Sequence, residues 1–133
     1  MKRWLSWSIV LVVIVISGGV LFAVTAHTHA AMRDIERLAT INDVRVALER
    51  YYALYNRYPR AETSISIDAR TLCASVAGWE NAGCNTPVLV RVAHDPSAAY
   101  AYQYTANGET YTLDFYLEQR DTGWHRATPT GIQ

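Results

Sequence analysis

Charged residues are absent from one long stretch near the start of this 133-residue sequence. From Trp4 to Ala26 there is no Asp, Glu, Lys or Arg, and no Pro, Asn or Gln. A helix needs about 20 apolar residues to cross the hydrocarbon core of a bilayer. The sequence therefore predicts a transmembrane segment, and the neutral overall charge of 12 basic and 12 acidic side chains conceals this division.

Lysine is absent after Lys2, so all later basic residues are arginines. Of the 12 basic residues only Lys2 and Arg3 precede the apolar stretch, which leaves ten Arg against 12 acidic residues beyond Ala26. A slightly acidic domain argues against nucleic acid as a partner. The length beyond Ala26 is enough for one domain of roughly 100 residues and excludes a multi-domain enzyme.

The flanks of the apolar stretch predict its orientation. Lys2 and Arg3 at the short end favour a cytoplasmic N-terminus and a C-terminal domain outside the cytoplasm. Trp4 and Trp7 lie where indole rings favour the membrane interface, so membrane lipid is an expected partner. The alternative is a signal peptide cleaved after Ala26, which also exports the domain.

Glycine and proline are absent between Val20 and Tyr58, and residues 33–57 follow a helical pattern. Three intrahelical ion pairs are possible, Arg33–Glu36, Asp34–Arg37 and Arg45–Glu49. Pro59 ends the helix. If it continues the membrane helix, the result is a rod of about 54 residues, roughly 80 Å long. The expected packing face of the helix comprises Leu38, Ile41, Val44, Leu48, Tyr51 and Tyr55.

The segment after the helix carries weaker signals. We expect a loop over residues 60–68, then a short helix over residues 69–77 that Asp68 caps at its N-terminus. Residues 88–92 are a possible strand, and Asp95-Pro96 forms a turn.

Strand patterns are clearest at the C-terminal end. Residues 100–104 and 111–117 alternate, and Asn107-Gly108 between them is a preferred hairpin pair. Residues 124–127 can return as a third strand after a turn. The predicted fold class is α+β, a long N-terminal helix packed on a small antiparallel sheet, with the tyrosines of 100–104 buried against the helix. The predicted division is 1–26 for the cytoplasmic stub and membrane helix, 27–58 for the amphipathic stem and 59–133 for the head.

This order of elements resembles the type IV pilins, and most closely the major pseudopilin of type II secretion. The matching segments in this sequence are residues 34–38 (Asp-Ile-Glu-Arg-Leu), 47–52 (Ala-Leu-Glu-Arg-Tyr-Tyr), Tyr58-Pro59, Asp95-Pro96, residues 100–104 (Tyr-Ala-Tyr-Gln-Tyr) and 111–113 (Tyr-Thr-Leu). The resemblance implies a structural or assembly subunit outside the cytoplasm, with other pilin-like or secretion and pilus assembly proteins as partners.

The sequence departs from this family at two functional features. The family's processing site, a Gly followed by Phe and a short run ending in Glu, is not present before the apolar stretch, and no carboxylate precedes Asp34. The acidic calcium loop of pseudopilins is not carried over either, because Asp114 and Asp121 are isolated and calcium takes about six to eight oxygen ligands.

Cys73 and Cys84 are the only cysteines, and both lie in the exported part. A disulfide between them is favoured over two free thiols and would contribute roughly 3 kcal/mol in the loop-entropy model. They do not form the Cys-x-x-Cys motif of redox proteins.

Residues for catalysis or cofactor binding are scarce. No serine lies in a nucleophile elbow, and His27 and His29 are expected as surface residues rather than metal ligands. We therefore predict no enzyme activity, cofactor or metal. The regular tyrosines favour a core, and Tyr116 and Trp124 are the best candidates for a partner surface. The expected function is a membrane-anchored pilin-like subunit, with an exported ligand- or protein-binding module as the alternative.

Overall fold

One continuous helix forms the axis of the molecule. The computed structural model describes residues 2–81, 83–119 and 121–133, and the side chains of residues 2–6 and of Ile9 lie outside that description. Helix α1 runs over Lys2–Tyr55, 54 residues without a break at the end of the apolar stretch. It ends two residues before the predicted boundary at 57, because Asn56 takes a left-handed conformation (φ 51°). The absence of Gly and Pro between Val20 and Tyr58 accounts for this continuity.

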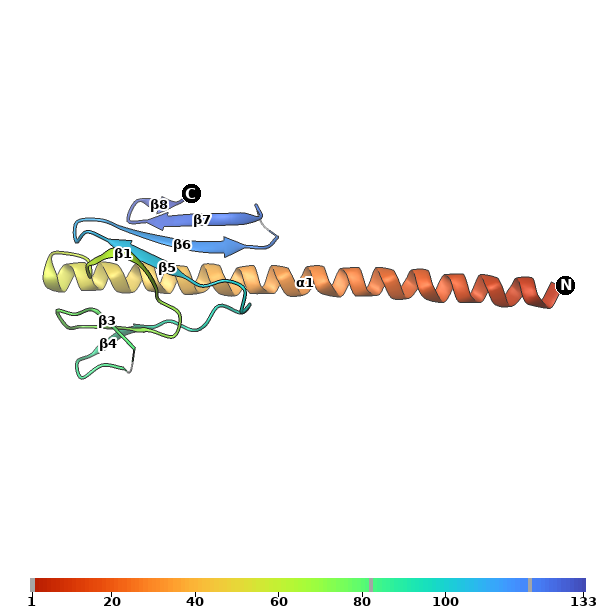
Figure 1. Cartoon of the computed structure of the whole chain (residues 1–133), viewed down its shortest axis with the longest axis horizontal. Coiled ribbons are helices and arrows are strands. Elements are labelled where there is room, and N and C mark those ends of the chain that lie inside the picture. Colours follow the sequence, from red (N-terminus) through yellow and green to blue (C-terminus); the bar gives the residue numbers. More distant parts are fainter. Residues whose placement is uncertain (1, 82, 120) are drawn as a thin grey trace.

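A five-stranded antiparallel sheet lies along one side of the C-terminal half of α1 (Figure 1). Its strand order is β1-β5-β6-β7-β8, so β1 and β8 form the edges. The strands are β1 (Ala61–Ser66), β5 (Gln103–Ala106), β6 (Tyr111–Leu117), β7 (Gly123–Thr128) and β8 (Gly131–Ile132).

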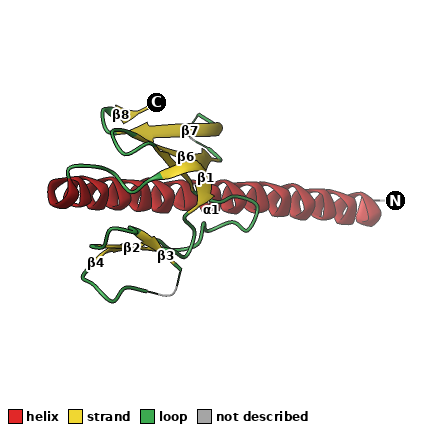
Figure 2. Ribbon diagram, turned by 60° about the vertical axis from the view of Figure 1, so that its left-hand side comes forward, coloured by secondary structure: helices red, strands yellow, loops and turns green. Residues whose placement is uncertain are grey.

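A second, three-stranded sheet lies on the other side of the same half of α1 (Figures 1 and 2). Its order is β3-β2-β4, with β2 (Thr71–Cys73) between β3 (Trp79–Glu80) and β4 (Val88–Arg91). The two sheets hold the C-terminal half of the helix, and its N-terminal half extends from the head as a bare rod (Figure 1).

The core forms where α1 meets the sheets. The inward positions of β6, Tyr111, Leu113, Phe115 and Leu117, are all buried, as strand alternation requires. Several core tyrosines satisfy their hydroxyls on backbone carbonyls: Tyr104 donates to Pro59 at 2.8 Å and Tyr51 to Ser75 at 2.9 Å. The α+β class predicted from the sequence is the fold of the chain.

The predicted helix over residues 69–77 is wrong. Residues 71–73 form β2 in the middle of the second sheet, and Ala69 has a left-handed φ of 57°, which no helix tolerates. Asp68 does cap backbone N–H groups, but they belong to Asp95 (3.2 Å) and Tyr102 (2.8 Å). Pairing with β3 and β4 outweighs the local helix signal.

The predicted loop over 60–68 is also wrong, because residues 61–66 form edge strand β1. The residues of β1 that face outward are polar, so the sequence shows no hydrophobic alternation that would have predicted this strand.

The predicted hairpin is present, but its loop is longer than the two residues expected. Ala106 pairs with Tyr111, and the amide of Asn107 donates to the carbonyl of Thr110 at 3.3 Å.

The tyrosines of residues 100–104 divide between two faces. Tyr102 and Tyr104 are buried as predicted, with exposed fractions of 1% and 0%. Tyr100 is the exception: it precedes β5, is half-buried, and stacks on Tyr116 at a centroid distance of 4.1 Å. The first tyrosine of the series therefore lies beyond the N-terminal end of β5, in contact with both Tyr116 of β6 and Arg37 of α1.

Candidate functional site

The bare half of α1 is the apolar stretch. Large hydrophobic side chains between Val10 and Val24 are 50–77% exposed, since no part of the head reaches them. The stretch is long and apolar enough to cross a membrane. Of the residues expected at the membrane interface, Trp7 is 72% exposed, and the side chains of Lys2, Arg3 and Trp4 lie outside the described residues.

A buried ion cluster joins α1 to the head just beyond this stretch. Arg37 on α1 is fully buried and forms a bidentate pair with Asp95, at 2.8 Å from Nε and 2.7 Å from Nη2. Its Nη1 reaches Asp34 Oδ1 at 3.0 Å and Glu118 Oε1 at 2.7 Å. The guanidinium also lies 5.4 Å from the ring centre of Tyr100. One helical side chain thus contacts two separate segments of the head.

Asp34 and Arg33 add to the same junction. The Asp34 carboxylate accepts the backbone N–H groups of Glu118 at 2.9 Å and Gln119 at 2.8 Å. Arg33 Nε donates to Glu118 Oε1 at 2.9 Å, and its Nη2 pairs with Oε2. The chain leaving β6 is therefore fixed to the helix by both backbone and side-chain contacts.

The electrostatics of the junction favour its ionised form. Hydrogen bonding to Asp95 raises the pKa of Arg37 despite its burial. Hydrogen bonding to Arg33 lowers the pKa of Glu118 below its ordinary value. Three carboxylates surround two guanidinium groups, so every buried charge has an opposite partner, as burial of ions requires. The arrangement is suited to holding two elements together, and it positions no group for acid–base chemistry.

Sequence reasoning missed most of this junction. The Asp34–Arg37 pair exists as predicted, but it is buried rather than on the helix surface. The predicted Arg33–Glu36 pair is replaced by Arg33–Glu118. A signal was present, because Asp34 and Arg37 continue the spacing of Ile41 and Val44 on the packing face. Charged residues on the packing face of a helix indicate a buried ion network if residues from distant segments can pair with them.

The other residues singled out from the sequence lie on the packing face and in the disulfide. Ile41, Val44, Leu48 and Tyr51 are fully buried in the core, and Leu38 and Tyr55 pack against it partly buried. Cys73 and Cys84 form the disulfide that was predicted, with Cα atoms 5.6 Å apart. It links β2 to the loop that precedes β4.

An aromatic cluster occupies the face of the five-stranded sheet that points away from α1. We call it the outer cluster and define it as Tyr100, Tyr116 and Trp124. Trp124 meets Tyr116 edge-on at 5.8 Å and is 59% exposed, whereas Tyr116 is half-buried. The two residues expected at a partner surface are therefore neighbours in adjacent strands.

The side of α1 that the sheets leave uncovered forms a second exposed surface, which we call the free helix face; at Val46 it borders Leu89 and Val90 of β4. Ala39 and Ala53 lie on it between larger residues and are exposed. Its large apolar members are Met32 (57% exposed), Ile35 (61%), Val46 (46%) and Leu54 (60%).

Comparisons with known proteins add no relative. No family model, no curated protein and no solved structure matches the chain.

Proposed function

We propose that this protein is a single-pass, membrane-anchored subunit of the pilin and pseudopilin type, with its N-terminus in the cytoplasm and its head outside. It serves as a structural or assembly component and carries out no catalysis. The observation that carries the proposal is the unbroken helix α1, whose bare half suits lipid and whose other half is built into the head.

The ion cluster supports a mechanical role for this helix. Arg37 lies only 11 positions beyond Ala26, the last residue of the uncharged stretch. A head attached through a flexible linker needs no such contacts at the base of its stem. Because Asp95 and Glu118 hold the helix at this point, a force or a docking event on the head is transmitted to the membrane segment as a rigid-body motion.

The free helix face supports association with other helices. Met32, Ala39, Val46 and Ala53 recur every seven residues, which places them along one side of α1. Small and apolar side chains in such a row allow a neighbouring helix to approach closely. The exposed residues beside this row are Glu36 and Asp43 nearer the membrane and Arg50 nearer the tip, so the charge along this face changes sign.

A matched pair of substitutions tests association. Val46→Arg places a charge on the free helix face, and Val76→Arg places the same charge at another exposed valine, 70% accessible, in the disulfide loop. We expect cross-linked oligomers in membranes for the wild type and Val76→Arg, and their loss for Val46→Arg. A wild-type chain that is monomeric in membranes at every expression level contradicts the proposal.

Anchoring is tested separately by fractionation and by mass spectrometry of the mature N-terminus. We expect the chain in the membrane fraction, resistant to extraction by salt and alkali. A soluble exported form that begins after Ala26 contradicts the anchored form and favours an exported binding module instead.

A further inference from the structure

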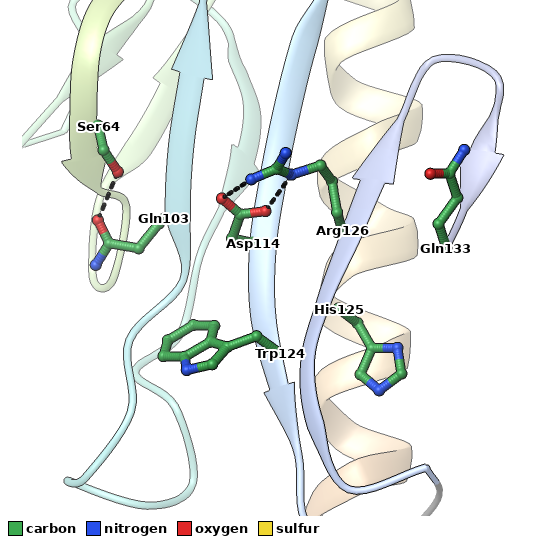
Figure 3. Close-up of a pocket in the computed structure, with 7 residues that line it drawn as sticks. All are labelled: Ser64, Gln103, Asp114, Trp124, His125, Arg126 and Gln133. Atoms are coloured by element: carbon green, nitrogen blue, oxygen red, sulfur yellow. Dashed lines mark hydrogen bonds and ion pairs between the residues drawn. The ribbon is translucent and has the colours of Figure 1, made fainter.

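A shallow groove of about 490 Å³ crosses the outer face of the five-stranded sheet. It is lined by residues of β1, β5, β6 and β7 and by the last residue, Gln133. Figure 3 shows the indole of Trp124 extending across β6 toward β5, beside the pair formed by Asp114 and Arg126. A groove of this size falls within the usual range for small-molecule sites, about 300–1,000 Å³.

Asp114 and Arg126, two of the residues that line the groove, form an ion pair with each other. Arg126 donates to Asp114 through Nε at 2.7 Å and Nη2 at 3.1 Å. The register of the strands enforces this pair, since the two residues are direct cross-strand partners. The pair itself carries no net charge, and His125 and Gln133 complete the lining of the groove.

The same groups keep hydrogen-bonding capacity toward solvent. The ion pair does not use Nη1 of Arg126, and the Arg126 side chain is 57% exposed. Ser64 donates to the amide oxygen of Gln103 at 3.1 Å, which fixes the amide and leaves its NH₂ group to donate outward. The groove therefore offers planar donors and acceptors in fixed positions on a rigid sheet.

The outer cluster supplies an aromatic wall at one end of this groove. Trp124 is held by edge contacts to Tyr116 at 5.8 Å and to Tyr100 at 6.5 Å, and it remains 59% exposed. Tyr100 is in turn fixed by the buried guanidinium of Arg37. An indole that is both exposed and held in place offers a preformed apolar surface to a ligand.

From these features we infer that the outer face of the five-stranded sheet is a binding site for neutral saccharides. A pyranose ring presents C–H groups on one face, which suit the Trp124 indole, and hydroxyls around its rim, which suit Asp114, Arg126 and Gln103. A charged ligand finds Asp114 and Arg126 already paired with each other, and a purely apolar ligand would leave this ion pair desolvated. The inference does not depend on whether copies of the chain assemble.

The test uses the full chain in micelles of an amine-oxide detergent, because detergents with sugar headgroups would occupy the site. Maltotriose, cellotriose and N,N′,N″-triacetylchitotriose are titrated while indole N–H signals are followed by NMR. We expect saturable, salt-independent binding of at least one trisaccharide, with the Trp124 signal shifting. Trp124→Ala should weaken that binding about fivefold to tenfold, and Arg126→Ala about fivefold.

Thr112→Ala is the matched control, since Thr112 also lies on β6 but does not line the groove. It should bind like the wild type, and the indole spectrum of each variant shows whether the fold is retained. The inference is overturned if none of the three sugars binds at concentrations on the order of 10 mM. It is equally overturned if binding survives both Trp124→Ala and Arg126→Ala, or if only acidic saccharides bind in a salt-dependent way.

Discussion

At the scale of single residues, Arg37 is a buried link between α1 and the head. Its guanidinium is fully buried and contacts Asp34, Asp95 and Glu118 from three parts of the chain. A buried charged side chain in such an ion cluster is tolerated only while its oppositely charged partners are present. Stability should therefore be unusually sensitive to this one side chain.

Replacing Arg37 by alanine should lower the free energy of unfolding by about 3–5 kcal/mol, because Asp95 is left as an unpaired buried charge. Denaturant unfolding of the full chain in micelles, followed by near-UV circular dichroism, measures this. Arg126→Ala removes an exposed pair of similar geometry and should cost less than about 1 kcal/mol. Equal effects of the two substitutions would show that the cluster does not hold the junction together.

The junction should also make stability depend on acid pH. Arg33 lowers the pKa of Glu118 in the folded state, so the unfolded chain takes up a proton on Glu118 more readily. The stabilisation is present above the ordinary pKa of 4.5 and is lost as the pH falls through the lowered folded value. Urea midpoints measured from neutral to acid pH should fall less steeply for Glu118→Gln than for the wild type. Parallel curves would mean that the pairing does not stabilise the fold.

At the scale of elements, the local sequence pattern agrees with the tertiary structure in α1 but not in residues 69–77. In α1 the apolar spacing from Ile41 to Tyr51 agrees with the packing, so the helix was predictable. In residues 69–77 the capping residue Asp68 indicated a helix, yet pairing with β3 and β4 makes residues 71–73 a strand. Short elements depend more on their partners than on their own sequence, because a single turn of helix is unstable alone.

The turn before β3 provides an element-scale prediction. Gly78 has φ +73°, and a Cβ atom there would lie 2.6 Å from Cβ of Pro59. Gly78→Ala should therefore destabilise the protein by about 2 kcal/mol or more, through both backbone strain and overlap. Gly83→Ala is the control, since Gly83 also has a positive φ (+93°) but nothing lies within 4 Å. It should cost only about 1 kcal/mol, and thermal unfolding of the two variants separates overlap from strain.

At the scale of the whole molecule, the chain combines a rod and a head whose core is rich in tyrosine. Aromatic rings provide a large buried area in a small domain, and the hydroxyls of Tyr104 and Tyr51 donate to backbone carbonyls. Burial in this core therefore favours the neutral form of the tyrosine phenol groups. The free helix face is made of residues of α1, whereas the groove of Figure 3 is lined by residues of the five-stranded sheet and Gln133, so association and ligand binding are separable.

The tyrosine core should make the fold sensitive to alkali. Burial raises the pKa of Tyr102 to about 12, and burial raises that of Tyr104 still further. A raised folded pKa contributes stability below pH 10, which is lost as the pH rises through the folded value. Ultraviolet titration should show the buried tyrosines ionising only in a late step that coincides with loss of near-UV circular dichroism. A single smooth titration of all tyrosines near their ordinary pKa would contradict this.

Local spacing is enough to predict the long helix and the strands at the C-terminal end, and two cysteines within a short segment are enough to predict the disulfide. The length of an apolar stretch, the helical period and the alternation of a strand involve residues that are close in sequence. These patterns can therefore be recognised without knowing the tertiary structure. Only the tertiary structure decided that Arg37 is a buried link to the head, that residues 71–73 are a strand, and that Asp114, Arg126 and Trp124 share one groove. These features join residues far apart in the chain, and their energies arise from burial and pairing that no local pattern encodes.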